Sequence, residues 1–295
     1  MAETQGELFG GPWTEKKLGV LGAYLAAYAK VMKNQSFVRL YVDAFAGTGY
    51  RETGSAEGDS GLFPCELAQD EPQQFLDGSA RIALGVQPVF DRYVFVEKSA
   101  KQFAKLVKLR EDFPELADRI DCIQGDANHV LQDLCDQWNS RTMRGVLFLD
   151  PYGMQVDWTT LEPVARTRAI DVWILFPLGI GVNRLLPRHG QVPDGWRTRL
   201  DRVFGTTEWY GAFYRPAGTR GLFDARPHLQ KTGSLNAIAE YYQERLRTIF
   251  PAVAENPKVL SNSRGTPLYL LCFAAGNPSP KAKDAALRIA QHILG

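Results

Sequence analysis

Short apolar runs alternate with longer helical patterns along most of this chain. The runs that predict buried strands cover residues 37–42, 93–97, 120–124, 146–150 and 171–177. Between them, apolar residues recur three and four positions apart, which places them on one face of a helix. Strands that alternate with helices form βαβ units, in which right-handed crossovers join parallel strands. The pattern therefore predicts an α/β protein with a doubly wound, mostly parallel sheet.

The helical patterns also reach beyond these runs. Thr14 can cap the first helix, whose apolar positions are Leu18, Leu21, Leu25, Tyr28 and Met32. Further helices are expected to begin at Ser79 and to cover residues 99–110, 129–138, 158–166, 235–250 and 282–294. The runs at 258–261 and 266–275 predict a closing hairpin.

Two segments interrupt the alternation. Residues 51–74 are rich in Gly, Ser, Glu and Asp and predict a long loop or a partly helical insertion. Residues 179–231 are irregular and rich in arginine and aromatic residues, so we expect a cap over the site. The expected organisation is one α/β domain made of residues 1–178 and 235–295, with residues 179–234 inserted as the cap.

A glycine loop, Asp43-Ala-Phe-Ala-Gly-Thr-Gly49, follows the first strand. Gly47 and Gly49 can adopt positive φ and let backbone N–H groups approach a ligand without an obstructing Cβ. Open α/β sheets bind ligands at the carboxyl ends of their strands, where this loop lies. The loop therefore indicates a site for a nucleotide-like cofactor, although glycine pairs are also common in ordinary tight turns.

A second segment, Leu147-Phe-Leu-Asp-Pro-Tyr-Gly153, ends an apolar strand with an acid, a proline and an aromatic residue. Together with the glycine loop it resembles class I methyltransferases, whose glycine loop is similar to DAFAGTG and whose catalytic tetrapeptide is similar to DPYG. DPYG departs from the common DPPY form by one proline and is similar to the DPFG form of tRNA guanosine dimethyltransferases. The resemblance implies a Rossmann-like methyltransferase fold with helices on both faces of the sheet. It also implies S-adenosylmethionine as the cofactor, with S-adenosylhomocysteine as the product.

The flanking segments narrow this resemblance. Four segments follow one another in the order typical of three-Cys-motif partner (TcmP) proteins. They are the helix opening Trp13-Thr-Glu-Lys-Lys-Leu18, the segments at 78–84 and 93–98, and Trp173-Ile-Leu-Phe-Pro-Leu178. The chain is similar to that family from about residue 13 to residue 186, and more weakly to its end. The family is named for a neighbouring radical-SAM-like protein, so the resemblance implies such a protein as a partner.

The methyltransferase pattern gives roles to several residues near the strand ends. Glu97 corresponds to the acid that accepts hydrogen bonds from both ribose hydroxyls, and otherwise is a plain strand-end glutamate. Asp126 corresponds to the position that recognises the adenine ring, and it is equally a good N-cap for the following helix. Asp43 is expected to fix the glycine loop or to meet the methionine end of the cofactor, with Phe45 packed beneath it.

The DPYG segment carries the expected chemistry. An exocyclic amine is a weak nucleophile, so an enzyme must accept its protons and hold the nitrogen in line with the sulfonium methyl. The Asp150 carboxylate and the Pro151 carbonyl can accept those hydrogen bonds, and Tyr152 can stack on an extruded base. In the alternative interpretation, Asp-Pro simply ends a strand and the tyrosine packs against it.

Composition sets broader limits. With 295 residues, 45% of them hydrophobic and 23% charged, the chain is typical of globular proteins. Its apolar stretches are shorter than the ~20 residues of a membrane span, and its start lacks the pattern of a secretory signal. We therefore expect a cytoplasmic location without membrane association. The four cysteines and four histidines lack metal-ligand spacing, so we expect no metal.

Charge gives one further indication about partners. The net charge of +1 does not predict a uniformly basic nucleic-acid-binding protein, but residues 179–202 hold five arginines against two aspartates, a local charge of +3 before His189 is counted. Arg184, Arg188 and Arg197 are therefore candidates for contacting nucleic-acid phosphates, with RNA favoured over DNA because of the DPFG-like segment. A solvated helix face explains the same charges equally well.

Two functions fit this sequence. The first is an S-adenosylmethionine-dependent methyltransferase that acts on an exocyclic amine of a nucleic-acid base. The second is a binding module that keeps the cofactor fold and serves mainly as the partner of the three-Cys radical-SAM-like protein. An intact set of Asp150, Tyr152 and Glu97 favours the enzyme, whereas a covered DPYG cleft would favour the module.

Overall fold

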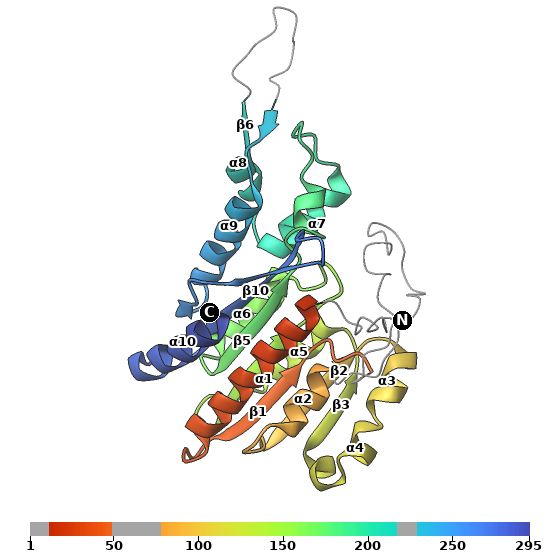
Figure 1. The fold of residues 1–295 in the computed structure, drawn as a ribbon, viewed down its shortest axis with the longest axis vertical. Helices are drawn as coiled ribbons and strands as arrows, with labels where there is room; N and C mark the ends of the chain where they lie inside the picture. The colour runs from red at the N-terminus through yellow and green to blue at the C-terminus, as the bar shows by residue number, and fades with distance from the viewer. Residues whose placement is uncertain (1–11, 49–77, 217–228) are drawn as a thin grey trace, which may run out of the picture.

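A large twisted sheet forms the centre of the computed structural model, which describes residues 12–48, 78–216 and 229–295 (Figure 1). Within these residues the sheet has eight strands in the order β3-β2-β1-β4-β5-β10-β8, and β9 pairs with β10 off this path. The strands are β1 Val38–Asp43, β2 Arg92–Glu97, β3 Ile120–Gln124, β4 Met143–Leu149, β5 Ile170–Phe176, β8 Ala252–Val253, β9 Lys258–Ser261 and β10 Pro267–Ala275.

The pairing directions confirm the predicted fold class. Strands β1 to β5 pair with one another in parallel, whereas β10 runs antiparallel to β5, β8 and β9. The predicted hairpin is the pair β9–β10, and the predicted strand at 120–124 has the same bounds in the structure. The chain therefore has a mostly parallel, Rossmann-like sheet, as the sequence pattern predicts.

Side chains alternate between the two faces of this sheet, as the period of a strand requires. On β4, Val146 and Phe148 point to one face, and Leu147 and Leu149 point to the other. The first face is covered by α1 Pro12–Met32, α2 Ser79–Gly85 and α10 Pro280–Leu294. The second face is covered by α5 Ala127–Asp136, α6 Trp158–Arg166 and α9 Leu235–Arg247. The prediction of helices on both faces is therefore confirmed.

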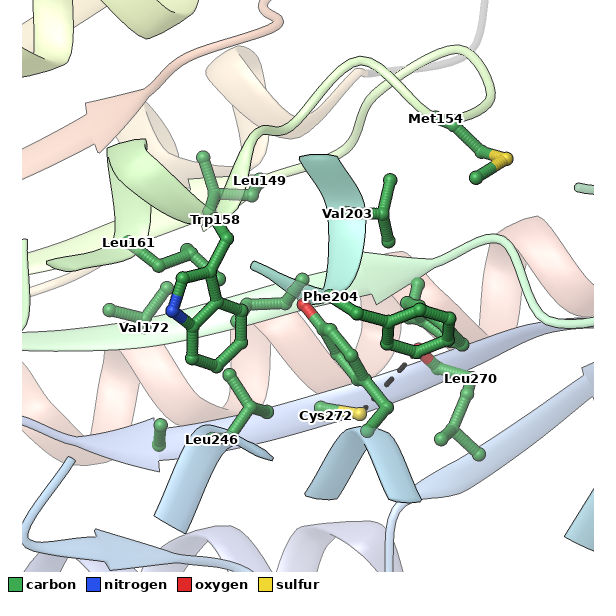
Figure 2. Packing of buried hydrophobic residues seen from close by; sticks show 14 of the residues in the cluster. Leu149, Met154, Trp158, Leu161, Val172, Val203, Phe204, Leu246, Leu270 and Cys272 are labelled. Carbon is green, nitrogen blue, oxygen red and sulfur yellow. Dashed lines mark hydrogen bonds between the residues drawn. The ribbon is translucent and has the colours of Figure 1, made fainter. Parts of the chain in front are cut away.

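Aromatic side chains fill the second face. Trp158 of α6, Phe204 at the end of α7 Asp194–Phe204, and Leu246 of α9 gather over β5 and β10 (Figure 2). Trp158 and Phe204 are almost completely buried, and burial of such a side chain contributes about 1.5–3 kcal/mol. Gly205 follows with φ of +66°, and a Cβ at this position would come within 2.1 Å of the Trp158 ring.

The segment expected to form a cap has its own short elements. They are η3 Val182–Leu185, α7, α8 Trp209–Phe213 and a ribbon of β6 Tyr214–Pro216 with β7 Leu229–Lys231. In Figure 1, α7, α8 and β6 stand above the sheet. Leu200, Trp209 and Phe213 of this segment are buried in the same hydrophobic cluster as the second face of the sheet. The division into 1–178, 179–234 and 235–295 stays a prediction.

Some helix boundaries differ from the sequence-based expectation. The first helix begins at Pro12, so Thr14 lies inside it and does not cap it; proline is favoured in a first helical turn because its missing N–H has no partner there. The helix expected at 99–110 is divided into α3 Ala100–Leu106 and α4 Leu109–Asp112, followed by η2 Pro114–Arg119. The break lets both Leu106 and Leu109 be fully buried.

The expected insertion at 51–74 lies outside the described residues. Among the helices that are described, none combines the length and apolar character needed to cross a bilayer.

Candidate active site

Strands β1 and β4 lie side by side, and the direction in which successive strands are added reverses between them. In open α/β sheets, ligands bind at such a switch point, beyond the carboxyl ends of the strands. Asp43 ends β1 opposite Phe148, and Asp150 follows the end of β4. Because side chains alternate along a strand, both carboxylates project from the face covered by α1 and α2. The fold therefore brings the acids of the two motifs together.

Lys17 of α1 also reaches this point and forms an ion pair with Asp150 Oδ2. Its side chain is 7% exposed and that of Asp150 is 21% exposed, so the ammonium is the more shielded of the two groups. Sequence reasoning missed Lys17. The signal that would have found it is its position four residues before Leu21 and seven before Tyr24, on the stripe of α1 that faces the sheet.

Asp43 is fully buried beside this pair. Its carboxylate accepts hydrogen bonds from Ser79 Oγ at 2.5 Å, from the Phe45 backbone N–H at 3.2 Å and from Tyr41 Oη at 3.5 Å. Burial raises the pKa of Asp43 to about 7; the hydrogen bond from Ser79 opposes this shift, and the nearby charge of Asp150 adds to it. The bond to Phe45 holds the start of the glycine loop against β1.

Aromatic residues border the same pair. Trp13 stacks on Tyr269 of β10 with ring centroids 5.1 Å apart, and the ammonium of Lys17 lies 5.3 Å from the centroid of Trp13. Burial raises the pKa of Tyr269, and the charges of Asp150 and Tyr152 raise it further. The two rings thus lie beside the ammonium that pairs with Asp150.

The DPYG turn itself presents one ring to solvent. Pro151 is buried, whereas Tyr152 is 55% exposed. Gly153 has φ of +79°, a conformation that glycine adopts without strain. The backbone N–H of Tyr152 donates to Gln155 Oε1 at 3.0 Å, which closes the turn.

Asn128 braces the residues that follow the turn. Its side-chain amide donates to the carbonyl of Gln155 at 2.9 Å. Its side-chain oxygen accepts hydrogen bonds from the Asp157 N–H at 3.1 Å and the Thr160 hydroxyl at 2.7 Å. One side chain of α5 thus connects the loop after DPYG to the start of α6.

The glycine loop is described as far as Thr48. Gly47 has φ of +60°, and among the described residues, its two chain neighbours aside, no atom lies within 4 Å of the place where its Cβ would stand. The Ala46 N–H donates to the Val96 carbonyl at 3.0 Å, which ties the loop to β2. Phe45 is partly buried against the core. Gly49 lies outside the described residues.

Glu97 and Asp126 lie at the ends of the next two strands. Glu97 Oε1 accepts a hydrogen bond from the Ser99 N–H at 2.6 Å. Asp126 caps α5 by accepting from the Asn128 N–H at 3.0 Å, and it also pairs with Lys98 at 3.2 Å. Burial alone would raise the pKa of Asp126, but the hydrogen bonds from Lys98 and Asn128 outweigh burial and lower it. Both acids therefore face the carboxyl edge of the sheet with at least one local partner.

The arginines of the cap fall into two kinds. Arg184, in η3, and Arg188 are exposed. Arg197 is partly buried, with its guanidinium 4.4 Å from the centroid of the Tyr210 ring. The neighbouring Arg202 donates two hydrogen bonds to Asp157, at 3.0 and 2.6 Å, and so joins the cap to the loop after DPYG. Arg184 and Arg188 are the two predicted arginines that present their side chains to solvent.

Within the three described ranges, no group of three or more His, Cys, Asp or Glu side chains is arranged to hold a metal ion. Cys122, Cys135 and Cys272 are free thiols, and Cys272 is buried. Cys65 and His228 lie outside the described residues.

Comparison with solved structures finds remote similarities. Protein LPL1258 from Legionella pneumophila, of family DUF519, has 13% identity and a TM-score of 0.47, with 98% of this chain and 94% of that chain covered. Spermidine synthase from Thermotoga maritima has 9% identity and a TM-score of 0.41, with 92% and 61% covered. An O-methyltransferase from Bacillus cereus, in complex with S-adenosylhomocysteine, has 13% identity and a TM-score of 0.39, with 86% and 80% covered.

No protein-family model matches this chain, and no curated protein matches it either. At the identities and TM-scores of the solved structures, the activity has to be inferred from the residues of the chain itself.

Proposed function

We propose that this chain is an S-adenosylmethionine-dependent methyltransferase that acts on an exocyclic amine of a nucleic-acid base. The observation that carries the proposal is the position of Asp150. Its carboxylate lies at the switch point of a methyltransferase-type sheet, beside the buried Asp43 and next to the exposed ring of Tyr152. A proton acceptor and a stacking surface are therefore adjacent where such sheets bind ligands.

The residues at the strand ends fit the cofactor. Gly47 holds a positive φ, and none of the described residues beyond its chain neighbours fills the place where a side chain would project, so ligand atoms can approach the backbone. Glu97 would hold the ribose, since Ser99 uses one of its carboxylate oxygens and a carboxylate accepts several hydrogen bonds. Asp126 would recognise the adenine amino group in addition to capping α5. When bound, the cofactor supplies an electrophilic methyl group.

Residues of the DPYG turn would then position the amine. The carboxylate of Asp150 and the carbonyl of Pro151 accept the hydrogens of the amine, which concentrates electron density on its nitrogen and orients its lone pair. Asp150 takes up the proton that the nitrogen loses after transfer. The ring of Tyr152 is half exposed and stacks on the target base, which keeps that base extruded from the nucleic-acid strand.

RNA is the favoured polymer in this proposal. The similarity of DPYG to the DPFG form of tRNA guanosine dimethyltransferases supports it, and so do the exposed Arg184, in η3, and Arg188, shortly after it. Phosphate contacts need such a local positive surface, because the net charge of the chain is only +1.

Membership of the TcmP family, and a three-Cys radical-SAM-like protein as the partner, belong to the same proposal and rest on the motif order in the sequence. The alternative function, a catalytically silent partner module, would be favoured by a covered DPYG turn. Tyr152 is 55% exposed, which favours the enzyme.

The test is transfer of a labelled methyl group from S-adenosylmethionine to RNA, DNA and protein from cells that lack this protein. We expect label in RNA, and mass spectrometry of the nucleosides would identify the methylated base. Asp150→Ala should lower kcat by ~10²–10³, the scale for removing one group that stabilises a transition state, and should leave the variant able to bind cofactor. Cofactor binding by the wild type without transfer to any of the three fractions would favour the partner module.

A further inference from the structure

Lys17 is a buried cation at the switch point. Its side chain is 7% exposed, and its ammonium is paired with Asp150 Oδ2. A buried ammonium that loses its counter-ion is strongly destabilised, because water cannot replace the lost partner. Any event that frees Asp150 from this pair must therefore bring another anion to Lys17.

Asp43 is poorly placed to be that anion. It lies close enough for its charge to interact with Lys17, but its carboxylate already accepts hydrogen bonds from Ser79, Phe45 and Tyr41. Those three bonds come from α2, the glycine loop and β1, so turning the carboxylate toward Lys17 would break contacts that hold the loop. The replacement anion is therefore expected to come from a ligand.

The proposed cofactor has such an anion. Its amino-acid end is a zwitterion with one carboxylate and one ammonium, and the group at the switch point consists of one ammonium, Lys17, and two carboxylates, Asp43 and Asp150. The charges of the site and of the ligand are complementary in both signs. A ligand without the carboxylate would leave Lys17 with Asp150.

We propose that Lys17 binds the carboxylate of the cofactor in exchange for Asp150, so that Asp150 becomes available to the target amine only after the cofactor is bound. This inference rests on the proposed cofactor and adds an order to the reaction. One oxygen of Asp150 is occupied by Lys17 in the structure. With cofactor, Lys17 keeps a counter-ion and Asp150 can accept from the amine.

Calorimetry with two ligands tests this exchange. One is S-adenosylhomocysteine, and the other is its analogue that keeps the amine and lacks the carboxylate. The wild type should prefer S-adenosylhomocysteine by ~10- to 100-fold, the range that corresponds to one hydrogen bond between charged groups. Lys17→Met should lose this preference and bind the two ligands about equally. Lys16→Met, at the neighbouring exposed position, should keep it.

Asp150→Asn distinguishes exchange from a permanent pair. If Asp150 competes with the cofactor carboxylate for Lys17, removing its charge should increase the preference for S-adenosylhomocysteine above that of the wild type. The amine-only analogue controls for any contact of Asp150 with the ligand ammonium. Thermal unfolding of each variant confirms that the protein is folded.

The outcomes separate this inference from the proposed function. Absence of binding of either ligand to the folded wild type would overturn both. Binding of S-adenosylhomocysteine with a preference that Lys17→Met leaves unchanged would overturn the role of Lys17 alone. An unchanged or reduced preference in Asp150→Asn would show that Lys17 and Asp150 stay paired, and would overturn the exchange.

Discussion

Lys17 and Asp150 are separated by 133 positions in the sequence and form an ion pair at the carboxyl end of β4. The pair joins the first described helix to the residue that is expected to accept a proton from the target amine. Its position at the switch point means that the buried face of α1 takes part in the candidate site, and does not serve only to cover the sheet.

Tyr152 is expected to act through its ring. Tyr152→Ala should weaken binding of an RNA substrate by ~1–3 kcal/mol, the range for stacking of one base on an aromatic side chain. Tyr152→Phe should bind nearly as well as the wild type, because stacking does not need the hydroxyl. Fluorescence anisotropy with a labelled RNA measures both, and equal losses in the two variants would argue for a role of the hydroxyl instead.

Glu97 is expected to determine cofactor affinity. Glu97→Ala should weaken binding of S-adenosylhomocysteine by about 1.5–3 kcal/mol for each charged hydrogen bond that is lost. Calorimetry provides the measurement, with Glu240→Ala on the exposed surface of α9 as the matched control. An unchanged dissociation constant in Glu97→Ala would leave Glu97 with its local role of accepting from Ser99.

The exposed arginines of the cap are expected to contact phosphates. The affinity for single-stranded RNA decreases with salt, and a plot of log affinity against log salt has a negative slope. In the double variant Arg184→Glu and Arg188→Glu, the magnitude of this slope should decrease by about 1.4, or ~0.7 for each lost contact. Arg247→Glu with Arg288→Glu, two exposed positions on α9 and α10, makes the matched control. If both double variants change the slope equally, the effect is one of net charge and not of a specific surface.

Stability is expected to depend on pH through Asp43. Burial raises its pKa to about 7, above the ordinary value of 3.8, so the folded state binds this proton more tightly than the unfolded state. The free energy of unfolding should therefore fall as the pH rises from about 4 to about 7. Asp43→Asn should flatten this dependence when Tm is measured between pH 5 and 8.

Asp171 is a second buried carboxylate, and it should leave part of the pH dependence of Tm in the Asp43→Asn variant. Burial raises the pKa of Asp171 to about 6, against hydrogen bonds from the Gly276 N–H and Tyr24. Its contribution has the same sign and is lost between about pH 4 and pH 6. The same Tm slope above pH 6 in the wild type and in Asp43→Asn would contradict the assignment to Asp43.

Gly205 is expected to be intolerant of a side chain. Gly205→Ala would force a residue with Cβ into a positive φ, at about 1–2 kcal/mol, and would also press the Cβ into the Trp158 ring. Gly211→Ala in α8 has open space around the added Cβ and should be neutral or slightly stabilising. Urea unfolding of the two variants gives the comparison, and equal effects would contradict the close packing at Gly205.

The parts of the fold that follow from local periodicity were predictable. The strand at 120–124 and the helix at 158–166 have the predicted bounds, because an apolar period reports directly on which face is buried. Asp43 and Asp150 could be placed at strand ends for the same reason. The division of residues 99–110 into two helices could not be predicted, since it depends on how Leu106 and Leu109 fit under the sheet.

The candidate site was harder to predict than the fold, because it depends on contacts between segments that lie far apart in the sequence. Whether Lys17 faces Asp150 depends on the rotation of α1 about its axis, which the apolar pattern determines only to within a residue or two. The hydrogen bond of Asp126 to its own helix was one of two open alternatives, and the structure shows that this bond is made. The pattern identified the acids at the sheet edge but not the partners of each acid.

The hydrogen bonds of Asn128 also limit how this protein can be altered. The side chain next to the predicted adenine-binding Asp126 is the one that holds Gln155, Asp157 and Thr160 behind the DPYG turn. A DPYG turn replaced by that of another protein could lack the carbonyl, N–H and hydroxyl groups that bond to Asn128. A change at the start of α5 that removes Asn128 would leave the native turn without these hydrogen bonds. Redesign of the target base should therefore exchange residues 126–128 and 150–160 together, as one unit.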